Sequence, residues 1–312
     1  YMIPSLWKQI PFLSFNHSTL FSCQNVKGQS PARNNVMSMA RFMIPRNVLF
    51  FSFNVIALIL FYMPIKRLIS FSLNDELFSY VLLIPFISGY LKYTKRNVIF
   101  ANKKYSYIPG TTTIILGIIF HFMGINQQMG FEQNDYLFIT VSSAMIFWTG
   151  GFVLFYGIQA VQNASFPLLF LIFMIPIPTY LLERIVFFLQ VGTAEAVSIF
   201  FNLIGITVFR EGLIFHLSNV SVEVAKQCSG IRSSMATVII GVLLGQIFLR
   251  SWWRKAVLLL SIIPLIIIKN GIRVTVLTLL GNYVDSKFLT NSVLHKSGGI
   301  VFFIPIVILL TV

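Results

Sequence analysis

Apolar stretches of roughly bilayer length recur along this chain from residue 47 to its last residue. They lie at 47–65, 76–91, 107–125, 136–157, 163–182, 229–249, 256–280 and 297–312. A helix needs about 20 apolar residues to cross the hydrocarbon core of a bilayer, and inside lipid each backbone polar group must find its partner within the protein. The sequence therefore predicts an all-α integral membrane protein with about eight transmembrane helices.

The composition excludes a water-soluble protein. Of the 312 residues, 56% are hydrophobic and only 10% are charged, whereas a soluble domain has about 25% charged residues. The net charge of +14 would indicate a nucleic-acid partner in a soluble protein. Here the cationic residues lie in loops between apolar stretches, as membrane topology requires, so we expect the lipid bilayer, and no nucleic acid, as a partner.

Two regions differ in composition. Residues 1–38 are polar and irregular, and we expect either a disordered tail or an extension upstream of a true start at Met37 or Met39. No convincing signal peptide is present. Residues 39–312 are predicted to form one multi-span domain.

Lysine and arginine in the short loops set the predicted orientation. The basic loops 92–104 and 250–255 are expected in the cytoplasm. Loop 126–135 carries two acidic residues and no Lys or Arg, so it is expected outside. The protein is predicted to be a multi-pass protein of the inner or plasma membrane.

The parity of the spans constrains residues 185–209. Five predicted spans precede residue 183, so one further crossing here would put the basic loop 250–255 outside. We therefore expect an amphipathic helix that is interfacial or re-entrant, with Glu195, Ser198 and Asn202 on one polar face. The alternative is an ordinary ninth span.

Residues 213–224 have a different pattern. Two apolar segments flank Ser218-Asn219, and Val220, Val222 and Val224 recur with period two. This pattern predicts a small β-hairpin on the outer surface, leading directly into Cys228.

Polar residues within membrane spans are costly and often functional, and they concentrate in the last third of this chain. Cys228 and Arg232 open the sixth predicted span, Asn270 and Arg273 lie inside the seventh, and His295 lies at the start of the eighth. The predicted depths agree, so we expect Cys228, Arg273 and His295 to meet in one cavity just below the outer surface.

These residue types fit a cysteine nucleophile. A helix N-terminus and nearby cations favour the thiolate of Cys228, and Arg232 follows one turn later. His295 titrates near neutral pH, and Arg273 can stabilise a thiolate or an oxyanion. Asn270, one turn from Arg273, is expected to orient it or to donate a hydrogen bond. Taken singly, each has an ordinary interpretation, such as a small buried cysteine or a snorkelling arginine.

An ordered set of motifs in residues 41–312 resembles the exosortase/archaeosortase family of membrane cysteine transpeptidases. The motifs are Pro176-Ile177-Pro178, Gln190, Gly205, Arg210-Glu211-Gly212, Val222-Glu223-Val224-Ala225, Cys228-Ser229-Gly230-Ile231-Arg232-Ser233, Pro264, Asn270-Gly271-Ile272-Arg273, and His295 with Gly298. The resemblance implies a catalytic triad of Cys228, Arg273 and His295. The supporting residues are expected to be Arg232, Asn270, Ser229, Gly230 and Glu223.

The resemblance also implies the substrates, which are secreted proteins with a C-terminal sorting signal. That signal is a short motif, then a hydrophobic helix and a basic tail. The enzyme cuts at the motif and passes the new C-terminus to a surface acceptor. One departure concerns the substrate motif, because Lys226-Gln227 stands where many relatives have an acidic or small residue before the cysteine.

Two other classes remain open. The first is a transporter or polysaccharide-export component with a structural cysteine, although no inverted repeat is visible. The second is a non-catalytic assembly protein. A serine protease is disfavoured because no Gly-x-Ser-x-Gly run occurs. No metal or other cofactor is expected, because the four histidines are scattered without ligand spacing.

Overall fold

The computed structural model describes residues 46–101, 105–126, 132–226 and 230–284. All of these residues belong to one unit of the chain, Ile44–Val312. Several sequence predictions concern residues outside the described part, namely those for 1–38, Cys228, Ser229, His295 and the span 297–312.

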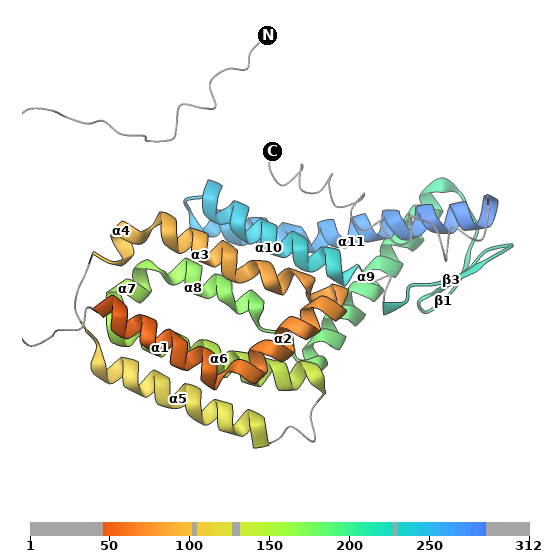
Figure 1. The fold of residues 1–312 in the computed structure, drawn as a ribbon. Coiled ribbons are helices and arrows are strands. Elements are labelled where there is room, and N and C mark those ends of the chain that lie inside the picture. The colour runs from red at the N-terminus through yellow and green to blue at the C-terminus, as the bar shows by residue number, and fades with distance from the viewer. Residues whose placement is uncertain (1–45, 102–104, 127–131, 227–229, 285–312) are drawn as a thin grey trace, which may run out of the picture. The chain divides into compact units, whose positions relative to one another are not determined.

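Helices dominate the described residues (Figure 1). Those of the first half are α1 (Arg46–Leu60), α2 (Tyr62–Asn74), the 3-10 helix η1 (Glu76–Leu83), α3 (Ile84–Thr94), α4 (Arg96–Ile99), α5 (Tyr107–Asn126) and α6 (Gln133–Tyr156). Those of the second half are α7 (Ile158–Asn163), α8 (Ser165–Phe170), η2 (Leu171–Met174), α9 (Thr179–Ile204), α10 (Ile231–Phe248) and α11 (Trp252–Tyr283).

Six helices within the described residues are long and apolar enough to cross a membrane, and the bent pair α1–α2 raises the number to seven if it is one span. This confirms a helical integral membrane protein; the described residues do not reach the predicted eight spans. Five predicted spans each correspond to one of these helices: 76–91, 107–125, 136–157, 229–249 and 256–280.

The first predicted span is a bent pair. The axes of α1 and α2 differ by 69°. Pro64 lies in the first turn of α2, and a proline ring clashes with the carbonyl group four residues earlier, here that of Leu60. The helix therefore breaks next to Leu60.

Glycines bring α5 and α6 into close contact. Gly110, Gly117 and Gly124 recur every seven residues and are all buried on α5. A Cβ atom on Gly110 would lie 2.6 Å from Leu154 Cα, and one on Gly117 would lie 2.6 Å from Phe147 N. Small residues of this kind let the backbones of membrane helices approach, and dispersion contacts then hold them together.

Residues 158–178 pass from one end of α6 to the other. They begin after Gly157, which closes α6. The residue that follows them, Thr179, lies at the other end of α6. Its backbone N–H donates to Oδ1 of Asp135 (2.8 Å), which is in the first turn of α6. The distance covered is about 36 Å, because α6 rises 1.5 Å per residue. The predicted span 163–182 is thus wrong as a continuous helix, since this path consists of α7, α8, η2 and a loop that contains two prolines.

Helix α9 differs from the prediction for 185–209 in its bounds. It begins at Thr179 and ends at Ile204, and its C-cap residue Gly205 adopts the left-handed conformation with φ +76°. Its 26 residues are long and apolar enough for a membrane crossing, which favours the alternative of an ordinary span. Its course is nevertheless oblique to α6 and α10 (Figure 1), and an interfacial placement stays a prediction.

A small three-stranded antiparallel sheet follows α9 in the otherwise helical structure. Its strands, in the order β1-β2-β3, are β1 (Phe209–Glu211), β2 (Ile214–His216) and β3 (Ser221–Glu223). The pairing of β2 with β3 confirms the predicted hairpin. Strand β1 was not predicted, because it has only three residues and two of them, Arg210 and Glu211, are charged. So short a segment shows no alternation of apolar and polar residues.

The sheet packs on two helices. Phe215 of β2 is buried beside Phe201 of α9 and Val274 of α11. At the turn of the hairpin, Asn219 N–H donates to Asn282 Oδ1 (3.2 Å) near the end of α11. The connection between α10 and α11 and the short helix α4 lie at the left in Figure 1, and the strands lie at the right. The two loops predicted to be cytoplasmic are thus at the same end of the helices.

Replacing Gly117 with Ala should lower stability by about 1–3 kcal/mol, because the new methyl group meets the backbone of Phe147. Thermal unfolding of the purified protein in detergent measures the loss. Gly89→Ala on α3 is the matched control, because a Cβ there meets nothing within 4 Å. Equal losses in the two variants would contradict close packing of α5 on α6.

Candidate active site

The turn that opens α10 is held by its own helix. Gly230 is the N-cap residue of α10 and has φ +71°. Its carbonyl oxygen accepts hydrogen bonds from Ser233 Oγ (3.0 Å) and Ser234 Oγ (2.8 Å). The left-handed conformation at Gly230 explains why glycine follows the predicted nucleophile so closely.

Asn270 joins this turn to two other helices. The side chain is fully buried in α11, and its Nδ2 donates to Thr193 Oγ1 of α9 (3.0 Å). A Cβ on Gly230 would lie only 2.8 Å from Asn270 Oδ1. Asn270 therefore lies where α9, α11 and the start of α10 meet.

Small residues allow this meeting of α9 and α11. A Cβ on Gly271 would lie 2.7 Å from Ala196 Cβ, and one on Gly192 would lie 2.8 Å from Ile267 Cδ1. A larger side chain at Gly271 would separate the two helices and would take Asn270 away from Thr193.

Two cations lie one turn apart on α11, and the first of them contacts the start of α10. Lys269 is buried, and its Nζ donates to Ser233 Oγ of α10. Arg273 is half-buried one turn later. Like charges four residues apart on a helix repel each other, so this arrangement favours an anion nearby.

Lys269 was given no role in the sequence analysis. It could have been singled out from the sequence, because ionisable residues are rare inside membrane spans and are often functional. The structure adds that Lys269 and Ser233 form a chain of contacts ending at the Gly230 carbonyl.

The other predicted supporting residues are placed differently. Arg232, in the first turn of α10, has an exposed side chain. Glu223 is also exposed, on β3 opposite Ile214. The structure thus brings Gly230, Asn270 and Arg273 to one region, leaves Arg232 at its surface and does not bury Glu223 there.

Helix α9 holds the segment that precedes Cys228. Gln190 Nε2, which is buried, donates to the Val224 carbonyl (2.7 Å). Two turns earlier on the same helix, Glu183 pairs with Lys226 Nζ (3.4 Å). The chain is therefore fixed on α9 just before residues 227–229 and on α11 just after them, at Gly230.

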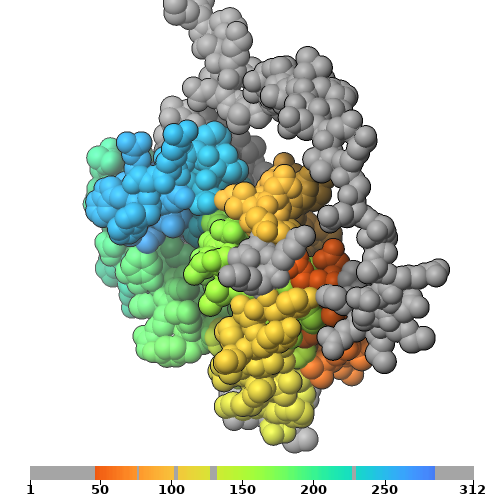
Figure 2. Space-filling view, turned by 90° about the vertical axis from the view of Figure 1, so that its left-hand side faces the viewer, coloured from red at the N-terminus to blue at the C-terminus, as the bar shows by residue number. Residues whose placement is uncertain are grey.

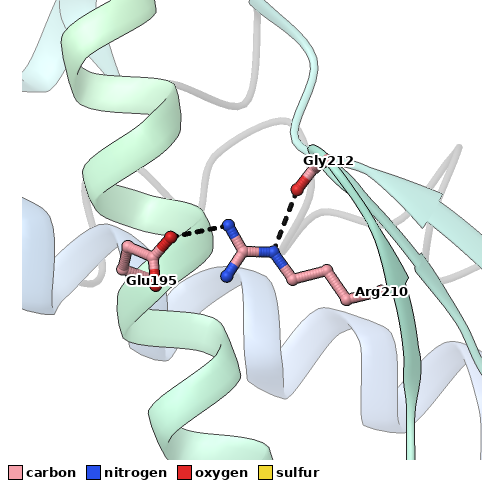
Figure 3. Close-up of polar contacts among 3 residues, drawn as sticks. All are labelled: Glu195, Arg210 and Gly212. Carbon is pink, nitrogen blue, oxygen red and sulfur yellow. Dashed lines mark hydrogen bonds and ion pairs between the residues drawn. The ribbon is translucent and has the colours of Figure 1, made fainter.

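A further contact ties β1 to α9 (Figure 3). Arg210 Nη2 lies 2.8 Å from Glu195 Oε1, and Arg210 Nε donates to the Gly212 carbonyl (2.9 Å). The hydrogen bond with Glu195 raises the pKa of the Arg210 guanidinium. An exposed ion pair adds little to stability, so its main effect is to position the sheet. This pair gives Glu195 a partner that the predicted polar face did not include.

The described residues contain no group of three or more His, Cys, Asp or Glu side chains that could hold a metal ion.

Comparison with known proteins adds one finding. The family model described as Transmembrane exosortase matches residues 72–312, well over half of the chain. No curated protein and no solved structure matches it. The matched range covers positions 228, 273 and 295.

Gly230→Ala should destabilise the protein more than Gly212→Ala. Both glycines have positive φ, so both variants should lose about 1–2 kcal/mol. Only the methyl group at position 230 also meets the buried Asn270 amide, which should add about 1–3 kcal/mol. Thermal unfolding in detergent compares the two, and equal losses would contradict the contact between Gly230 and Asn270.

Proposed function

Because this chain belongs to the transmembrane exosortase family, we propose that it is a membrane cysteine endopeptidase and transpeptidase. Its substrates would be secreted proteins that end in a short motif, a hydrophobic helix and a basic tail. It would cleave at the motif and transfer the new C-terminus to an acceptor at the cell surface. The active site would face away from the cytoplasm.

The observation that carries the proposal is the contact between Gly230 and Asn270, beside Lys269 and Arg273. Consecutive Cα atoms are 3.8 Å apart, so two residues of chain span at most about 7 Å. By chain connectivity, the proposed nucleophile Cys228 would then be within reach of the start of α10 and of the α11 cations. Positive charge near a thiol lowers its pKa and favours the thiolate, which supports Cys228 as the nucleophile.

The proposed reaction has two steps. The Cys228 thiolate attacks the carbonyl carbon at the motif, and Arg273 stabilises the negative oxygen of the tetrahedral intermediate. The C–N bond then breaks, His295 gives a proton to the leaving amine, and a thioester remains. An acceptor nucleophile attacks the thioester carbon, passes its proton to His295 and releases the Cys228 thiolate.

The remaining polar residues would position these groups. Lys269 holds Ser233 and, through it, the Gly230 carbonyl, so it would keep the nucleophile turn against α11. Exposed Arg232 would contact the substrate rather than the oxyanion. Gln190 and Glu183 hold the chain on the other side of Cys228.

Cys228→Ala should abolish cleavage of a co-expressed candidate substrate with a motif, helix and basic tail, and uncut substrate should accumulate in the membrane. Cys228→Ser should also be nearly inactive, because a serine hydroxyl is far less acidic than a thiol. His295→Ala should likewise fail to process the substrate. Immunoblotting for the tail measures cleavage, and hydroxylamine should release a thioester-linked adduct from the wild type alone.

A transporter or export component would need no nucleophile at position 228. Normal processing by a folded, membrane-inserted Cys228→Ala variant would therefore reject the enzyme proposal.

Arg273→Lys keeps the charge but removes the planar fork of donors, so it should reduce the cleavage rate by roughly 10²–10³-fold, as loss of an oxyanion donor does. Arg232→Lys is the matched control and should have a much smaller effect, because Arg232 is exposed. Single-turnover cleavage by the two variants measures the difference. Similar losses at both positions would mean that the roles of the two arginines are wrongly assigned.

A further inference from the structure

A cavity of about 430 Å³ lies among α1, α2, α3, α6 and η2. None of its lining residues belongs to α9, α10, α11 or the sheet, so it is separate from the candidate active site. Most of its wall is apolar and includes Leu58, Phe61, Leu68, Met145 and Met174. Its volume lies in the range of small-molecule pockets, roughly 300–1,000 Å³.

Most polar groups in the wall already have partners inside the protein. Trp148 Nε1 donates to Asn54 Oδ1 (2.8 Å), and Asn54 Nδ2 donates to the Phe50 carbonyl (2.6 Å). Ser88 Oγ donates to the Pro167 carbonyl (2.7 Å). These groups therefore place little demand on a ligand.

Lys92 is different. Its Nζ lies over the rings of Phe152 (4.5 Å), Trp148 (5.3 Å), Phe100 (5.7 Å) and Phe50 (5.8 Å). Among the described residues, the ion pairs join other side chains and none includes Lys92. Ring faces attract an ammonium group but do not neutralise it. Lys92 was predicted to begin the basic loop 92–104, but it lies in α3, inside the candidate span Leu77–Thr94. A charge within a membrane span is costly, so an anion at Lys92 would be stabilised.

The surroundings of Lys92 strengthen the positive potential. The guanidinium of Arg46 lies over the ring of Tyr156 (4.6 Å). That ring contacts the ring of Phe50, which is one of the four rings beneath Lys92. Lys95 and Arg96 follow Lys92 by about one turn and are exposed. Figure 2 shows this end of the helices, where α4 and the α10–α11 connection come to the surface.

The rest of the cavity suits a hydrocarbon chain. Along α6 its wall runs from Val141 to Thr149, about 12 Å at 1.5 Å per residue. Apolar cavities hold water poorly, and an empty one forfeits dispersion contacts along its wall. At Gly89 of α3 the wall leaves room, since a Cβ there meets nothing within 4 Å.

We infer that this cavity binds an anionic phospholipid of the surrounding bilayer, with one acyl chain in the cavity and the phosphate at Lys92. The argument for this occupant is complementarity, because the cavity is apolar along its length and cationic where Lys92 lines it. Basic pockets between membrane helices on the cytoplasmic side are known receptors for anionic head groups, and this end carries the loops predicted to be cytoplasmic. The lipid would fill the space between α1–α2 and α6.

Native mass spectrometry of the full-length protein, purified with either phosphatidylglycerol or phosphatidylcholine of the same chains, tests this inference. The wild type should retain one phosphatidylglycerol molecule at least tenfold more tightly than phosphatidylcholine. Lys92→Met keeps the apolar stem but removes the charge, so it should lose the preference between the two lipids. Lys95→Met is the matched control and should keep it, because Lys95 does not line the cavity.

Gly89→Leu tests the chain-binding part without touching Lys92. The new side chain should occupy the cavity and reduce retention of both lipids, while the protein remains monodisperse on size exclusion. Unchanged retention in Gly89→Leu, equal effects of Lys92→Met and Lys95→Met, or no preference in the wild type would each overturn the inference. The readout needs no catalysis and can be made on Cys228→Ala, so its failure is separable from failure of the proposed function.

Discussion

The candidate site depends on the contact of three helical elements around the buried amide of Asn270. Lipid provides no hydrophobic drive for helices to associate, so close packing through small residues and polar contacts must do so. Gly192, Ala196 and Gly271 let α9 and α11 approach, and Asn270 then reaches Thr193 on one side and Gly230 on the other. The start of α10 at Gly230 is held by that contact.

Around this contact, the sheet connects α9 to residues 224–226, which precede α10. Arg210 pairs with Glu195, Asn219 bonds to Asn282, and Gln190 holds the Val224 carbonyl. Each interaction alone is modest, since exposed ion pairs and single hydrogen bonds add little net stability. Their common effect is geometric, because they fix the path of the chain on α9 and α11 before it enters α10. The lipid cavity inferred around Lys92 lies among other helices, so the two sites can vary independently.

Much of the helical arrangement was predictable, and the exceptions have physical causes. Apolar length found α5, α6, α10 and α11, because a membrane helix needs an apolar run of known size. It could not find the breaks in residues 165–178, since α8 and η2 are mostly apolar and differ from a continuous span in their backbone path. In the candidate site, Arg273 and Asn270 stood out as polar residues in a span. Lys269 stood beside them, but its role required the partner Ser233 to be seen.

By itself, the sequence determined that this protein is embedded in a bilayer, which of its loops are basic, and which few residues are candidates for catalysis. It could do so because charge and apolar length are properties of the chain that hold in any fold. Its ordered motifs also indicated the family. Only the tertiary structure decided that α9 is one helix from Thr179, that Gly230 touches Asn270, and that Lys92 lies over four aromatic rings beside a cavity. These facts depend on which side chains from distant segments face each other, and that choice is made by packing between helices rather than by any local pattern.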